Sequence, residues 1–132
     1  MNNETIKILI ADDEARMRAL VRDYLRVKGF QVLEAENGAE ALAVFEREPD
    51  IALVLLDVMM PELDGFETLK ELRRISEVPV LMLTARSEER DELRGFSLGA
   101  DEYIAKPFSP KVLMARVEAV LKRTAANPEG VV

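Results

Sequence analysis

The chain has 132 residues, of which 48% are hydrophobic and 33% charged, and its formal net charge is −7. This length suits one globular domain with a single core, and the acidic balance argues against a nucleic-acid-binding surface, which would need clustered Lys and Arg. The chain contains no cysteine and no histidine, which excludes disulfides, thiolate and imidazole metal ligands, and catalysis by Cys-His or Ser-His pairs.

Four short apolar runs, each bounded by turn residues, are typical of strands buried on both faces of a parallel sheet. They span residues 7–11, 51–56, 80–83 and 103–105, and residues 31–35 are expected to form a short second strand. The segments between them carry apolar residues at helical spacing, such as Leu20 and Val21 in the first and Phe45 in the second. Gly29 and Gly99 provide stop signals for the first and fourth helices.

The later helices carry clearer start signals. A loop with Pro61 leads to the third helix, and Ser109 with Pro110 reads as the N-cap and first position of the last one. We expect the domain to cover residues 1–123. Residues 124–132 have no periodicity and are expected to be a linker or tail.

Alternating strands and helices with short connections predict right-handed crossovers and a mostly parallel sheet covered on both faces. The first strand must lie centrally if its end is to reach both Asp57 and Lys106. That requirement favours the flavodoxin-like α/β sandwich, with five parallel strands in the order 2-1-3-4-5.

Polar side chains follow four of the five expected strands. Asp12 and Asp13 follow the first strand, Asp57 the third, Thr84 the fourth and Lys106 the fifth. Ligands of open parallel sheets bind at the carboxyl ends of the strands, so we expect these side chains to converge there. Clustered carboxylates repel one another and require a divalent cation, which predicts a metal and phosphoryl site.

Each of these residues also has a simpler interpretation. Asp12 and Asp13 could cap the first helix, whose dipole favours negative charge. Asp57 could be a solvated loop acid, Thr84 a cap for the fourth helix, and Lys106 a surface lysine. These interpretations would all have to hold at once, and that coincidence argues against them.

Five segments resemble the receiver domain of two-component response regulators, in the same order and at the same spacing. They span residues 10–14, 56–61, 64–65, 83–85 and 99–108. The resemblance extends from about Ile6 to Arg123, nearly the whole chain. Asp101-Glu102-Tyr103 followed by residues 106–110 is similar to the OmpR/PhoB-type transcription factors.

The resemblance implies a role for each site residue. Asp57 would accept the phosphoryl group of a phosphohistidine on a separate sensor histidine kinase, forming an aspartyl phosphate. Asp13, Asp57 and the Met59 carbonyl would bind Mg²⁺ directly, and Asp12 would act mainly through a bound water. Lys106 would pair with a phosphoryl oxygen, so that catalysis is positioning plus electrostatics.

The resemblance also implies a switch. Thr84 would move toward the phosphoryl group and Tyr103 would rotate into the vacated space, which biases the packing of the fourth helix and fifth strand. Pro107 would follow a cis peptide bond that aims the preceding lysine inward. The bulky Met59 and Arg86 beside the site indicate a long-lived phosphoryl group.

OmpR/PhoB-type receivers form a two-fold homodimer through the fourth helix, fifth strand and fifth helix. The residues that look like this interface are Leu93, Phe96, Asp101, Glu102, Met114 and Arg116. One expected bridge is missing, because Glu92 stands where the family usually has a basic residue and Val112 where it has an acid. An exposed pair contributes only about 0–1 kcal/mol, so we expect the activated domain to dimerise.

The resemblance leaves the output open. The chain stops in what resembles the linker to a winged-helix DNA-binding domain, so we expect a truncated receiver that controls transcription, with a stand-alone single-domain regulator as the alternative. A phosphorylation-independent interaction module is a second alternative, and the intact set Asp13, Asp57, Thr84 and Lys106 argues against it. A small aspartate phosphatase would carry a second acid two residues after the nucleophile, where this chain has Met59.

We therefore expect a receiver that catalyses only its own phosphorylation and slow dephosphorylation, and not an enzyme acting on other substrates. No apolar run approaches the roughly 20 residues that span a bilayer, and the polar N-terminus does not look like a signal peptide. A cytoplasmic protein without a membrane segment, and without direct binding of nucleic acid by this chain, is the expectation.

Overall fold

The computed structural model describes residues 6–85 and 89–126. The strands are β1 (Lys7–Ala11), β2 (Gln31–Ala35), β3 (Ile51–Asp57), β4 (Val80–Thr84) and β5 (Glu102–Ala105). The helices are α1 (Ala15–Val27), α2 (Gly38–Arg47), α3 (Gly65–Leu72), α4 (Glu89–Ser97) and α5 (Pro110–Ala126).

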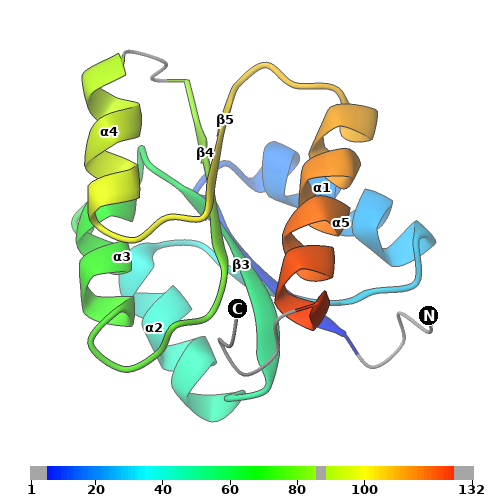
Figure 1. Ribbon diagram of the computed structural model, residues 1–132, viewed down its shortest axis with the longest axis horizontal. Helices are drawn as coiled ribbons and strands as arrows, with labels where there is room; N and C mark the ends of the chain where they lie inside the picture. Colours follow the sequence, from blue (N-terminus) through cyan, green and yellow to red (C-terminus); the bar gives the residue numbers. More distant parts are fainter. Residues whose placement is uncertain (1–5, 86–88, 127–132) are drawn as a thin grey trace.

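All five strands pair in parallel, in the order β2-β1-β3-β4-β5. This confirms the fold expected from the sequence. Helices α2, α3 and α4 cover one face of the sheet, and α1 and α5 cover the other (Figure 1). Within residues 6–85 and 89–126, no helix is both long enough and apolar enough to cross a membrane.

The inner strands β1, β3 and β4 are almost entirely apolar because their side chains pack into two hydrophobic cores, one on each face of the sheet. In β1, Leu9 packs toward α2 and α3, whereas Ile8 and Ile10 pack toward α1 and α5. All three are at most 1% exposed. Because successive side chains of a strand point to opposite faces, a sheet with helices on both sides needs such unbroken apolar runs.

Three helices begin with side-chain caps. The Asn37 side chain accepts a hydrogen bond from the Glu40 amide at 2.8 Å and caps α2. Asp64 caps α3 in the same way. The Ser109 hydroxyl accepts from the Val112 amide at 3.1 Å, which confirms the predicted start of α5.

The expected end of the last helix was wrong, and the simpler interpretation of Asp12 and Asp13 as helix caps is excluded. Helix α5 continues to Ala126, three residues beyond its expected end at Arg123, because nothing in residues 124–126 breaks a helix. Residues 127–132 of the expected linker lie outside the described residues. The N-cap of α1 is Glu14, without a side-chain cap bond, so Asp12 and Asp13 are not the caps of that helix.

Candidate functional site

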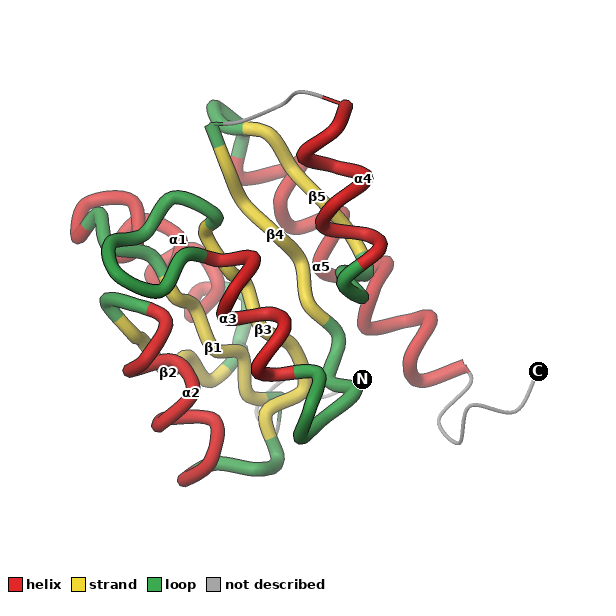
Figure 2. Tube along the Cα trace, turned by 90° about the vertical axis from the view of Figure 1, so that its left-hand side faces the viewer, coloured by secondary structure: helices red, strands yellow, loops and turns green. Residues whose placement is uncertain are grey.

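The register of the sheet brings the predicted site residues to one edge. Ala11 pairs with Leu56, so the next residues, Asp12 and Asp57, lie side by side where the neighbouring strands β1 and β3 end. Thr84 pairs with Ala105, and Lys106 follows directly. The loops after these strands lie at the top of Figure 1, where β4 leads toward α4 and β5 toward α5, and Figure 2 shows the same edge from the side.

Three carboxylates form the centre of the site. Asp12, Asp13 and Asp57 each offer one oxygen, and these oxygens all lie within 4.8 Å of one another. Asp12 and Asp57 are buried, at 0% and 3% exposure, whereas Asp13 is exposed to solvent. A set of oxygen ligands alone, with an open side toward water, suits a hard cation such as Mg²⁺ that keeps part of its hydration shell.

Lys106 supplies the balancing positive charge. Its Nζ lies 3.1 Å from Asp12 Oδ2 and 3.4 Å from Asp57 Oδ1. Its backbone N–H donates to the Thr84 carbonyl at 2.6 Å. The peptide bond between Lys106 and Pro107 is cis, as the family resemblance implied.

The crowding of charge perturbs both key groups. Burial, and then repulsion from Asp12, raises the pKa of Asp57 to about 6 from an ordinary 3.8, although Lys106 opposes this. Burial lowers the pKa of Lys106, but attraction and hydrogen bonds from Asp57 and Asp12 outweigh it and leave this pKa raised. At neutral pH the site therefore holds a costly excess of negative charge.

The carboxylates open into a surface cleft. Its lining consists of Asp12, Asp13, Glu14, Asp57, Met59, Ala85 and Lys106. Met59 is 53% exposed at the rim, whereas Thr84 is fully buried at the end of β4. Arg86, expected to flank the site, lies outside the described residues.

Two residues near the acids had no role assigned from the sequence. A Cβ on Gly65 would lie 2.3 Å from the Asp57 carbonyl oxygen, so only glycine lets α3 approach the acceptor strand so closely. Arg18 of α1 donates from Nη1 to the Asp12 carbonyl at 2.7 Å. Sequence spacing gives no signal for this bond, because a long side chain can fold back along its helix.

Tyr103 does not start from an exposed position. It is 7% exposed, and its ring lies 6.5 Å from that of Phe96, centroid to centroid. A Cβ on Gly95 would touch the ring at 3.4 Å. The Tyr103 side chain already lies inward, because Gly95 leaves room for its ring against α4. The inward rotation expected on phosphorylation therefore has no outward starting position in this structure.

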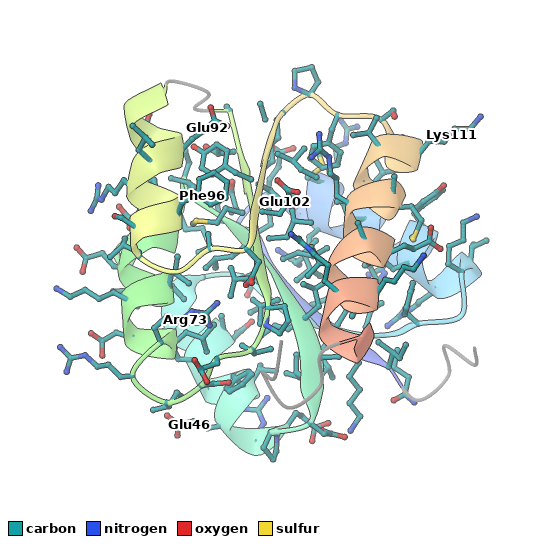
Figure 3. All side chains as sticks on the ribbon, viewed as in Figure 1. Glu46, Arg73, Glu92, Phe96, Glu102 and Lys111 are labelled. Carbon is teal, nitrogen blue, oxygen red and sulfur yellow. The ribbon has the colours of Figure 1, made fainter. Side chains whose placement is uncertain are left out.

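The expected dimer residues fall into two groups. Leu93 and Phe96 of α4 are 61% and 45% exposed, as a docking patch requires. Met114 is only 4% exposed and packs in the core beneath α5, so the expectation that it lies in an exposed patch was wrong. The side chain of Phe96 on α4 lies on the side of that helix toward Glu102 of β5, and Glu92 lies nearer the N-terminal end of α4 (Figure 3).

The acidic residues before Tyr103 already have partners within the chain. Glu102 Oε2 lies 3.3 Å from Arg116 Nη1. Asp101 Oδ2 accepts from the Val80 amide at 2.9 Å and lies 3.3 Å from Arg73 Nη2. Asp101 therefore fastens the start of β5 to β4 and α3, in addition to any role between chains.

Residues 8–118 match the family described as response regulator receiver domain. The chain is 50% identical over 123 residues to the probable transcriptional regulator ycf27 of Pyropia yezoensis, covering 93% of this chain and 50% of that protein. It is 49% identical over 121 residues to the transcriptional regulatory protein ResD of Bacillus subtilis, covering 92% and 50%. The chain thus spans about half the length of the curated relatives it matches.

Solved structures give the same placement. The chemotaxis protein CheY4 of Vibrio cholerae superposes with a TM-score of 0.84 at 33% identity, covering 88% of this chain and 98% of that one. A CheY-like receiver domain from Methanospirillum hungatei gives a TM-score of 0.87 at 27% identity, covering 92% and 98%. The chain belongs to the response regulator receiver family, and its relatives include OmpR-type transcriptional regulators.

Proposed function

We propose that Asp57 accepts a phosphoryl group in a Mg²⁺-dependent reaction and that this modification switches the domain. The observation that supports the proposal most directly is the cluster of three carboxylate oxygens within 4.8 Å, with the ammonium of Lys106 in contact with two of the acids. A cluster with this cost to folding makes sense where a cation and a phosphoryl group complete it.

Each residue has a distinct task in this proposal. Asp57 attacks phosphorus, so that a carboxylate oxygen–phosphorus bond forms as the phosphorus–nitrogen bond of the donor phosphohistidine breaks, and the leaving imidazole takes up a proton. Asp12, Asp13 and the Met59 carbonyl would help to hold Mg²⁺, which would neutralise charge on the phosphoryl oxygens. Lys106 pairs with a phosphoryl oxygen and Thr84 offers its hydroxyl to another.

The donor is proposed to be a sensor histidine kinase. Residues 1–132 contain no histidine, so the phosphohistidine has to come from outside this domain. The output is proposed to be transcription, because ycf27, CpxR and ResD are named as transcriptional regulators. This chain corresponds to about half of each of them, and a DNA-binding segment would lie elsewhere in a longer protein.

A small phosphodonor tests the proposal without the kinase. Acetyl phosphate with Mg²⁺ should add one phosphoryl group, detected as the mass of the intact protein. Chelation of Mg²⁺ should prevent the addition, and Asp57→Asn should abolish it. Asp50→Asn is the matched control, because Asp50 is an exposed acid paired with Lys7 at the opposite end of the sheet. Equal labelling of Asp57→Asn and the wild type would contradict the assignment.

We further propose that the phosphorylated domain pairs two-fold through α4, β5 and α5. Support comes from Leu93 and Phe96, two large apolar side chains exposed on one helix, and from the Glu102–Arg116 pair beside them. Val112 of α5 is a further exposed apolar side chain, at 45%. Burial of apolar area in a symmetric contact is the favourable term, whereas rim ion pairs contribute mainly to specificity.

Charge reversal on α5 tests the dimer. Sedimentation of the domain with beryllofluoride at Asp57 should show a dimer, and Arg116→Glu should weaken it. Lys111→Glu is the control, because Lys111 is on the same helix but points away from α4 and β5 (Figure 3). A wild-type domain that stays monomeric, or equal dimerisation of both variants, would count against this interface.

A further inference from the structure

Every polar atom of Asp12, in its backbone and its side chain, makes a hydrogen bond. Its N–H donates to the Ala35 carbonyl at 3.1 Å, which ties it to the end of β2. Its carboxylate accepts from the Glu14 amide at 2.9 Å and from Lys106 Nζ at 3.1 Å. Its carbonyl oxygen accepts from Arg18 Nη1 at 2.7 Å. This last bond is the one made by a charged side chain to the peptide that joins Asp12 to Asp13.

Arg18 is itself held in place. Its Nε lies 3.1 Å from Glu34 Oε1 on β2, and its side chain is only 14% exposed. The other oxygen of Glu34 lies 3.3 Å from Arg22 Nη1, one helical turn further along α1. The first turn of the helix also closes between the Arg18 amide and the Glu14 carbonyl at 3.0 Å. The guanidinium thus spans from β2 to the turn that carries the two acids.

We infer that Arg18 is a positioning residue of the acidic site, acting through the Asp12–Asp13 peptide. A peptide unit is planar, so holding its carbonyl oxygen fixes the plane from which the backbone of Asp13 departs. Asp13 is the exposed member of the cluster, and its carboxylate has less packing around it than those of Asp12 and Asp57. The charge-assisted bond from Arg18 therefore orients the carboxylate that most needs orienting.

Glu34 makes this arrangement compatible with cation binding. An unpaired guanidinium beside the acids would repel a divalent cation, but the carboxylate of Glu34 balances its charge. Arg18 can then orient the Asp12–Asp13 peptide without strongly repelling a bound cation. Groups that orient metal ligands in this way commonly change metal affinity by roughly 10- to 100-fold when removed.

The inference rests on the proposed Mg²⁺ site. The direction in which Mg²⁺ affinity changes when Arg18 is replaced distinguishes positioning from the effect of removing a positive charge. Removing a positive charge near three carboxylates should by itself strengthen binding of a cation. Loss of positioning should weaken it. Arg18→Met and Arg22→Met remove the same charge from the same helix, but only Arg18 bonds to the Asp12 carbonyl.

The test is titration with MgCl₂ followed by backbone amide NMR shifts, with urea unfolding measured alongside. We expect Arg18→Met to weaken Mg²⁺ binding by roughly 10-fold and Arg22→Met to leave it unchanged or slightly stronger. Arg18→Lys, which keeps the charge and loses the fork, should fall between wild type and Arg18→Met. If Arg18→Met does not fold, weaker binding by Arg18→Lys than by Arg22→Met carries the same test.

The outcomes are distinct. Equal Mg²⁺ affinity in wild type, Arg18→Met and Arg18→Lys would overturn the inference but leave the metal site intact. Equal weakening in the Arg18 and Arg22 variants would also overturn it, because the effect would then belong to Glu34 or to the helix. A wild-type domain that does not bind Mg²⁺ would instead contradict the proposed function.

Discussion

Replacing Asp57 with asparagine should stabilise the metal-free domain at neutral pH. The pKa of this carboxyl is about 6 in the folded chain against an ordinary 3.8. Each pH unit of this difference is worth about 1.4 kcal/mol, so ionised Asp57 costs the fold on the order of 3 kcal/mol at pH 7. Asparagine removes that cost but deprives Lys106 of one partner, so we expect a net gain of roughly 1–3 kcal/mol.

The dependence of folding stability on pH follows from the same pKa shift of Asp57. Because the pKa of Asp57 is higher in the folded than in the unfolded chain, folding takes up protons between about pH 3.8 and pH 6. Stability from this group is therefore lost as the pH rises through that window. The gap between Asp57→Asn and wild type should widen by about 1 kcal/mol from pH 5 to pH 7.

Urea unfolding in EDTA, followed by circular dichroism at pH 5 and pH 7, measures both quantities. Asp50→Asn is the control, because Asp50 is exposed, its pKa is lowered by the hydrogen bond from Lys7, and its removal should be neutral or slightly destabilising. An Asp57→Asn domain less stable than wild type at pH 7, or a stability difference between the two that does not change with pH, would contradict a raised pKa for Asp57.

Three further substitutions test neighbouring parts of the site. Lys106→Met should lower the free energy of unfolding in EDTA by roughly 3 kcal/mol, since it leaves the buried carboxylates of Asp12 and Asp57 without the lysine ammonium that pairs with them. Its Mg²⁺ affinity from NMR titration should not fall, and a large loss would contradict the assignment of metal binding to the acids and phosphoryl binding to Lys106. Gly65→Ala should cost about 1–3 kcal/mol in urea unfolding and slow acetyl phosphate labelling, because its Cβ would displace the Asp57 carbonyl. Asp64→Ala should cost about 1 kcal/mol by loss of the α3 cap with labelling unchanged, and slower labelling would show that the cap also shapes the site.

The sequence was sufficient to predict the order of the strands and, to within one residue, their bounds. The segments 7–11 and 31–35 coincide with β1 and β2. For β1, an inner strand with helices on both sides, the apolar run ends where polar residues begin, at Asp12. The meeting of Asp12, Asp57 and Lys106 followed from the same argument, since the ends of parallel strands share one edge.

Details of side-chain direction did not follow from the sequence. Met114 lies next to Leu113 along α5, and both are buried because the apolar face of this helix is wide enough to include two successive residues. Asp101 bonds to the Val80 amide 21 residues away, which depends on how β4 and the α4–β5 loop pack. The bond from Arg18 to Asp12 is of the same kind.

The position of the phosphoryl group shows directly whether Asp57 is the acceptor. The domain is treated with acetyl phosphate and Mg²⁺, the acyl phosphate is reduced with borohydride to a stable homoserine, and the modified residue is located by peptide mass spectrometry. The proposed function predicts homoserine at position 57 and none in samples treated with EDTA. Homoserine at Asp12 or Asp13 with none at Asp57, or equal modification without Mg²⁺, would contradict it.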